Sequence, residues 1–123
     1  EIEYYPHHFR ARFNLGKILL ARGDFDGYMK QMEKVIEFAP EEAEGYLFYA
    51  RGKLLRQDNP EDILKLINTG LSRAKTPELK ALGYYLLADV YSRLGQTIGV
   101  QEALARANQY KNQAENKKNE KTD

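Results

Sequence analysis

Apolar side chains recur along this chain every three or four residues, the spacing that places them on one face of an α-helix. No sustained alternation of apolar and polar residues, the pattern of a strand, appears. Gly23 and Gly95 suit the left-handed conformation just past a helix end. Asn59-Pro60 and Thr76-Pro77 each offer a capping side chain followed by a proline at the first helical position. The sequence therefore predicts six helices, over residues 7–22, 25–38, 41–56, 60–73, 77–94 and 97–112.

A short segment near the N-terminus recurs one helix pair later. Ile2-Glu3-Tyr4-Tyr5-Pro6 returns as Ile36-Glu37-Phe38-Ala39-Pro40, an offset of 34 residues. This offset is typical of a two-helix repeat, in which each helix pair buries its apolar face against the next pair. The connections between the predicted helices are short, as antiparallel neighbours require. We therefore expect an all-α solenoid of antiparallel helix pairs.

The apolar residues keep one register in three successive helix pairs. The first helices of the pairs read Arg12-x-x-Leu15-Gly16-x-x-Leu19, Tyr46-x-x-Tyr49-Ala50 and Tyr84-x-x-Leu87-Ala88-x-x-Tyr91, and the second helices read Tyr28-x-x-x-Met32-x-x-Val35, Ile63-x-x-x-Ile67-x-x-Gly70 and Val100-x-x-x-Leu104-x-x-Ala107. In this register the chain resembles the tetratricopeptide repeat (TPR) family, with about three repeats. It departs from the family pattern with Arg12 at a position for a large residue, and with Tyr28 and Gly70 where Ala is usual.

The resemblance implies a right-handed, TPR-like α-solenoid over residues 1–112. Its repeats would cover residues 9–42, 43–80 and 81–112, and residues 1–6 would be the remnant of a preceding helix. An independent N-terminal turn that only looks repetitive is the alternative. Residues 113–123 are polar and suit a solvated tail or a frayed helix end. We expect the chain to be a fragment of a longer protein.

Family members bind peptides in a concave groove lined by the first helix of each repeat. The resemblance implies the following groove positions here: Arg10, Phe13, Lys17 and Leu20; Glu44, Leu47, Arg51 and Leu54; Leu82, Tyr85, Asp89 and Ser92. Phe13, Leu47 and Tyr85 would form an apolar row beside a charged row of Lys17, Arg51 and Asp89. Some of these residues could instead pack against neighbouring repeats, Leu20 and Leu54 above all. Such a groove would suit a segment with apolar anchors and at least one acidic group.

The composition is that of one soluble domain with a large surface: 123 residues, a formal net charge of +1, 42% hydrophobic and 30% charged residues. The absence of Cys excludes disulfides and thiolate metal sites. It leaves the compartment open, with the cytoplasm slightly preferred. No apolar run approaches the roughly 20 residues that a membrane span needs, so we expect no membrane insertion.

Candidate chemistry is sparse. His7 and His8 are adjacent, and adjacent residues on a helix point about 100° apart, so they cannot share a metal ion as residues one turn apart can. Asp24-Phe25-Asp26-Gly27 lacks the other motifs of a kinase, and we interpret it as the turn between two helices. Lys117-Lys118 is too short a basic run for nucleic-acid binding. We expect no catalytic activity, no cofactor and no metal site.

The predicted function is a non-catalytic interaction module that binds a peptide or protein segment in its concave groove, within a larger protein or assembly. One alternative is self-association, in which apolar surface from Ile2, Tyr4 and Phe9 makes copies dock end to end into a homo-oligomer. Another is a regulatory domain appended to an enzyme that lies upstream.

Overall fold

A computed structural model describes the backbone of residues 6–122 and the side chains of residues 9–120. Over that range the chain contains six helices and no strand: α1 (Pro6–Ala21), α2 (Phe25–Phe38), α3 (Ala43–Arg56), α4 (Pro60–Arg73), α5 (Pro77–Arg93) and α6 (Thr97–Thr122). The predicted all-α class is confirmed. The expected remnant at residues 1–6 lies outside the described residues, except for Pro6, which begins α1.

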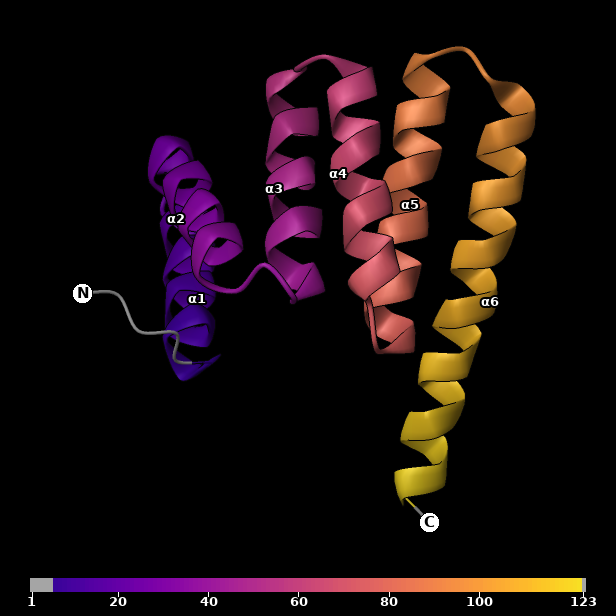
Figure 1. The fold of residues 1–123 in the computed structure, drawn as a ribbon. Coiled ribbons are helices and arrows are strands. Elements are labelled where there is room, and N and C mark those ends of the chain that lie inside the picture. Colours follow the sequence, from indigo (N-terminus) through magenta and orange to yellow (C-terminus); the bar gives the residue numbers. More distant parts are fainter. Residues whose placement is uncertain (1–5, 123) are drawn as a thin grey trace.

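The helices stack as successive antiparallel pairs (Figure 1). Contacts join consecutive helices along the whole chain, and α3 also touches α5. The pair α1–α2 forms one end of the stack, and α6 forms the other end and extends beyond its neighbours (Figure 1). This is a helical-repeat arrangement, although the division into three repeats with the boundaries given above stays a prediction.

The predicted helix boundaries agree closely with the structure in all helices but the last. The helices predicted over 25–38 and 60–73 have those bounds, whereas the last helix continues to Thr122 instead of ending near 112. Ala114 is buried, so α6 still contacts the bundle beyond the predicted end. The Lys, Glu and Gln residues around it are good helix formers even when solvated. The prediction placed the end of α6 too early because it relied on the polar composition of residues 113–123 alone.

The turns follow the predicted capping chemistry. The Asp24 side chain accepts a hydrogen bond of 2.9 Å from the Gly27 amide, so the predicted turn is the start of α2. Asn59 and Thr76 cap α4 and α5 in the same way. Gly23 has φ of +85°, a left-handed conformation that a side chain would strain. These local signals set where α2, α4 and α5 begin and where α1 ends.

Successive helix pairs approach closely because glycines face their neighbours. A Cβ atom added at Gly45 would lie 2.9 Å from Cγ1 of Ile36 on α2. One added at Gly52 would lie 2.2 Å from the Met29 sulfur, also on α2. At Gly83 it would lie 2.3 Å from Cδ2 of Leu71 on α4. The helix backbones are therefore closer than any larger side chain allows.

Tyr28, the bulkiest departure from the family pattern, fits because of this close approach. Its ring is 1% exposed and lies against Gly52, and its hydroxyl donates to the backbone carbonyl of Phe48. Burial raises the pKa of the Tyr28 phenol to about 12. Tyr28 therefore stays neutral at physiological pH and ties α2 to α3.

The core consists of two clusters of buried side chains. One lies between α1, α2 and α3, and the other extends from α3 to α6. Phe9, expected in exposed end surface, is only 3% exposed. Leu15 and Leu104 have the spacing of interior residues but are 44% and 39% exposed. Helical spacing alone would place both in the interior, but each lies on an end helix, on a face that no described residue covers.

Replacement of Gly70 by Ala tests the close packing. The new Cβ atom would lie 2.6 Å from Cδ2 and 2.7 Å from Cγ of Leu47, which is fully buried and cannot move aside freely. We expect Gly70→Ala to destabilise the fold by about 1–3 kcal/mol, although Ala is the better helix former. Urea unfolding measures the change. Asn68→Ala, at an exposed position of the same helix, should change stability by less than about 0.5 kcal/mol.

Candidate functional site

Two residue pairs connect the first helices α1 and α3, and a third pair follows them on the same helix faces. We call them the α1–α3 row: Arg10 with Glu44, Phe13 with Phe48, and Lys17 with Arg51. Members of successive pairs are three or four residues apart on each helix, so each helix presents them on one face. The contacts of the first two pairs join α1 to α3, and the residue spacing assigns Lys17 and Arg51 to the same faces of these two helices.

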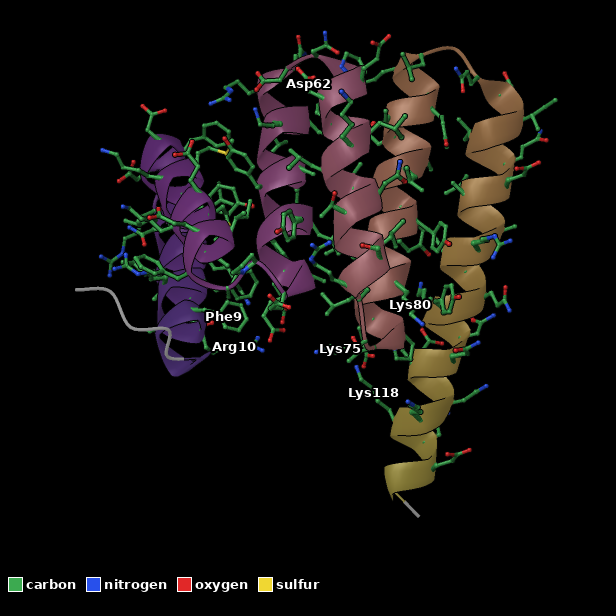
Figure 2. The ribbon with its side chains drawn as sticks, in the orientation of Figure 1. Phe9, Arg10, Asp62, Lys75, Lys80 and Lys118 are labelled. Atoms are coloured by element: carbon green, nitrogen blue, oxygen red, sulfur yellow. The ribbon has the colours of Figure 1, made fainter. Side chains whose placement is uncertain are left out.

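The first pair is an ion pair. Nη2 of Arg10 lies 3.2 Å from Oε2 of Glu44, and Arg10 reaches from the lower end of α1 toward α3 (Figure 2). The Glu44 side chain is only 11% exposed, whereas that of Arg10 is 55% exposed. Because the carboxylate is largely removed from water, it depends on Arg10 for compensation. This pair therefore joins two repeats by charge.

The second pair is aromatic. The ring centroids of Phe13 and Phe48 lie 4.8 Å apart with an interplanar angle of 79°, an edge-to-face contact. Phe13 is 5% exposed, while Phe48 is only partly buried. The contact therefore leaves part of the Phe48 ring open to a ligand.

The third pair consists of two like charges. Lys17 follows Phe13 by one turn, and Arg51 follows Phe48 by one turn; both are exposed. The Lys17 ammonium lies 5.3 Å from the centroid of the Phe13 ring. Among the described residues, no carboxylate lies within ion-pair distance of either cation. Each of these two cations is therefore available to an external anion.

Other cations nearby are paired within the protein. Nη2 of Arg56 lies 2.6 Å and Nζ of Lys53 lies 3.3 Å from Oδ2 of Asp58. Arg93 lies 3.6 Å from Asp89 and donates a 2.8 Å hydrogen bond to the Leu54 carbonyl. These internal partners reduce their capacity to bind an external anion. Lys17 and Arg51 differ from them in lacking one.

An exposed apolar side chain lies next to the like-charge pair. Leu55 follows Arg51 by four residues on α3 and is 62% exposed. On a helix, residues four apart share a face, so Leu55 continues the surface of the α1–α3 row. The surface thus offers positive charge and apolar area together.

The predicted site residues on α5 are exposed but largely occupied by internal contacts. Tyr85 is 36% exposed, and its hydroxyl donates a 2.8 Å hydrogen bond to Oδ1 of Asn108 on α6. Asp89 pairs with Arg93, and Ser92 is exposed. No contact joins these three side chains to the α1–α3 row within the described part of the chain. Their role in binding stays a prediction.

The predicted apolar row of Phe13, Leu47 and Tyr85 needs correction. Leu47 is fully buried and belongs to the core between α3, α4 and α5, and Phe13 is nearly buried. Neither side chain can contribute much contact area to a ligand. Phe48 and Leu55, each one residue further along α3 than the predicted Leu47 and Leu54, face the surface instead.

A sequence signal for this shift exists. Glu44 and Arg51 share one helical face, which Phe48 and Leu55 continue at three- and four-residue steps. Leu47 and Leu54 lie about 100° away from these residues on the helix. On α3, the helical face that carries Glu44 and Arg51 therefore identifies the surface better than the positions of Leu47 and Leu54 do.

The expectations of no metal site and no membrane insertion can be compared with the described residues only. Side chains of His, Asp and Glu within residues 9–120 form no group of three that could hold a metal ion. The side chains of His7 and His8 lie outside this range. Within residues 6–122, every helix is too short or too polar to cross a lipid bilayer.

The Arg10–Glu44 pair can be measured by a double-mutant cycle with Arg10→Met and Glu44→Gln. We expect a coupling energy of about 0.5–1 kcal/mol, since Arg10 is half exposed and solvent screens the interaction. The coupling should decrease at 1 M NaCl because salt shortens the range of the attraction. A coupling near zero in low salt would contradict the proposed link between α1 and α3.

Asp58 gives a pH-dependent signal at the end of α3. Hydrogen bonds from Arg56, assisted by Lys53, lower the pKa of the Asp58 carboxyl from 3.8 to about 2. The lowered pKa means that this pairing stabilises the fold above about pH 4 and that the stabilisation is lost as the pH falls through about 2. NMR titration of the carboxyl carbon should report this value. Arg56→Gln should raise it toward 3.8, and an unchanged titration would refute the assignment.

Comparisons with known proteins support the fold of this chain but identify neither its family nor its function. No protein-family model matches this chain, and no curated protein matches it. Among solved structures, the globular C-terminal domain of LpoP from P. aeruginosa is similar, with a TM-score of 0.71 and 23% sequence identity. The similarity covers 81% of this chain and 94% of that chain. The chain therefore has the helical fold of that domain, and membership of the TPR family stays a prediction.

Proposed function

We propose that this chain is a non-catalytic protein-interaction module that binds an acidic segment of a partner protein along the α1–α3 row. The observation that carries the proposal is the third pair, Lys17 with Arg51. Both cations are exposed and have no carboxylate within ion-pair distance among the described residues, whereas Arg10, Lys53 and Arg56 each have one. A surface of this kind favours an anionic ligand.

The ligand needs an apolar residue as well as a carboxylate. Leu55 and the open part of Phe48 lie within one turn of Arg51 on the same face. A segment with one or two acidic residues followed by an aliphatic or aromatic side chain would bury Leu55 while its carboxylate binds Lys17 and Arg51. Such short segments usually bind with a Kd on the order of micromolar, or about 8 kcal/mol.

The similar fold of the LpoP domain adds support at a coarser level. Helical-repeat folds present extended concave surfaces, and proteins use these surfaces for binding. A role in protein binding, inside a larger protein or assembly, agrees with the stacked helix pairs and with the exposed charged surface. The α5 residues Tyr85, Asp89 and Ser92 would contact the far end of a longer segment.

Charge reversal tests the proposal. Peptides selected from a random peptide library on the wild-type protein should contain acidic residues next to an apolar one. Lys17→Glu with Arg51→Glu should weaken their binding at least tenfold, because two attractive contacts become repulsive. Fluorescence anisotropy measures the affinity, and circular dichroism verifies that the helices are intact.

A control double variant changes the net charge by the same amount at positions outside the α1–α3 row. Lys30→Glu with Lys65→Glu reverses two exposed cations on the second helices α2 and α4. These variants should retain the wild-type affinity to within about twofold at 150 mM salt, where charges farther apart than about 8 Å are screened. Equal loss in both double variants, or none in either, would exclude the α1–α3 row as the binding site.

A further inference from the structure

An open cavity lies between α5 and α6, the last helix pair of the stack (Figure 1). Its volume of about 240 Å³ exceeds the roughly 150 Å³ of an engineered protein cavity that binds benzene. The uncharged residues that line it include Tyr84, Leu87 and Tyr91 on α5, and Gly99 and Ala103 on α6. We call it the α5–α6 cavity. It shares no residue with the α1–α3 row.

Small residues on α6 account for the open space. Because α6 begins 37 residues after α4, Gly99 and Ala103 correspond to Asp62 and Leu66 of the preceding pair. Leu66 is partly buried and packs against the core, whereas Ala103 offers only a methyl group to the same region of its own pair. The sequence difference between α4 and α6 therefore enlarges the space beside α5.

The aromatic walls of the α5–α6 cavity are held in place by other contacts. The ring of Tyr84 stacks on that of Tyr110, with centroids 5.8 Å apart and an interplanar angle of 8°. The Lys80 ammonium, on α5 beside α6, lies 5.4 Å from the Tyr110 centroid (Figure 2). Gly99 lies directly against Tyr91, since an added Cβ atom would be 2.8 Å from Cγ of that ring. Walls that are already ordered lose little conformational entropy when a ligand binds.

Two opposite charges of α6 also line the cavity. Glu102 and Arg106 are exposed, and their spacing of four residues places them on one face of the helix. The guanidinium carbon of Arg106 lies 6.0 Å from the centroid of the Tyr84 ring. Among residues 9–120, neither Glu102 nor Arg106 has an opposite charge within ion-pair distance. Both charges are therefore available to a ligand.

We propose that the α5–α6 cavity binds a small zwitterion, namely a free α-amino acid with an apolar side chain. Its carboxylate would bind Arg106, and its ammonium group would bind Glu102. The apolar side chain would lie against Leu87 and the rings of Tyr84 and Tyr91. Small-molecule sites typically combine an apolar lining with a few polar groups that fix the orientation of the ligand.

Charge complementarity selects this class of ligand. A simple carboxylate would be attracted by Arg106 but repelled by Glu102, and a simple amine would experience the reverse. A residue inside a polypeptide has neither of the two terminal charges. The free amino acid is the occupant that satisfies both charged side chains and fills the apolar part of the cavity.

Titration of the 15N-labelled protein with L-phenylalanine, followed by NMR, tests the proposal. Backbone amide signals of cavity residues such as Gly99 and Ala103 should shift saturably, with a Kd on the order of 0.1–1 mM. N-acetyl-L-phenylalanine and L-phenylalanine amide each lack one charge and should bind at least about tenfold more weakly. L-Alanine retains both charges but cannot fill the cavity, so it should also bind at least about tenfold more weakly.

Charge-neutralising variants identify the site. Arg106→Gln and Glu102→Gln should each weaken the binding of L-phenylalanine at least about fivefold, because each removes one charged contact. Arg22→Gln and Glu115→Gln are the matched controls, since they remove the same charges at exposed positions outside the cavity. The controls should retain the wild-type affinity to within about twofold, since exposed charges more than about 8 Å from the ligand are screened at 150 mM salt.

Ala103→Leu tests the cavity itself. It introduces the side chain that Leu66 provides on α4, and it should abolish the binding of L-phenylalanine by filling the cavity. Circular dichroism and thermal unfolding verify that all variants remain folded. The proposal is overturned if L-phenylalanine causes no saturable shifts, or if the N-acetyl acid or the amide binds as tightly. Undiminished affinity in Arg106→Gln or Glu102→Gln would also overturn it.

Discussion

The stack depends on the close approach of each helix pair to the next. Glycines at Gly45, Gly52 and Gly83 allow side chains of α2 and α4 to lie directly against the backbones of α3 and α5. At each of these positions glycine is a poorer helix former than alanine by about 1 kcal/mol, and the packing must offset that difference in free energy. The buried Tyr28 shows the benefit, since its ring fills the space beside Gly52 and its hydroxyl joins the α3 backbone.

Side chains of the α1–α3 row make the contacts between α1 and α3. Along the row the interaction changes from an ion pair to an aromatic contact and then to two like charges. The first two pairs stabilise the stack. The third pair, Lys17 with Arg51, has no carboxylate within ion-pair distance among the described residues and is where we propose that a ligand carboxylate binds. Substitutions in the third pair can therefore test binding while the contacts of the first two pairs remain.

Both ends of the stack expose apolar side chains. On α6, Ile98 and Leu104 are 71% and 39% exposed, although Gln101 occupies a position that is apolar in the earlier pairs. On α1, Leu15 and Ile18 are 44% and 49% exposed. Within a solenoid such faces are buried by the next helix of the stack.

The helices themselves were determined by the sequence, because local signals suffice for them: the proline and capping residue at Asn59-Pro60 start α4 where they stand, and Gly23 ends α1. The charged residues of the α1–α3 row were among the groove positions expected from the repeat register, and their role in binding stays a prediction. The tertiary structure alone decided that Leu47 is core and that Phe48 faces the surface, since both have helical spacing and only the positions of α1 and α4 distinguish them. It likewise decided that Leu15 is exposed: periodicity shows which residues share a face, but burial depends on whether another helix covers that face.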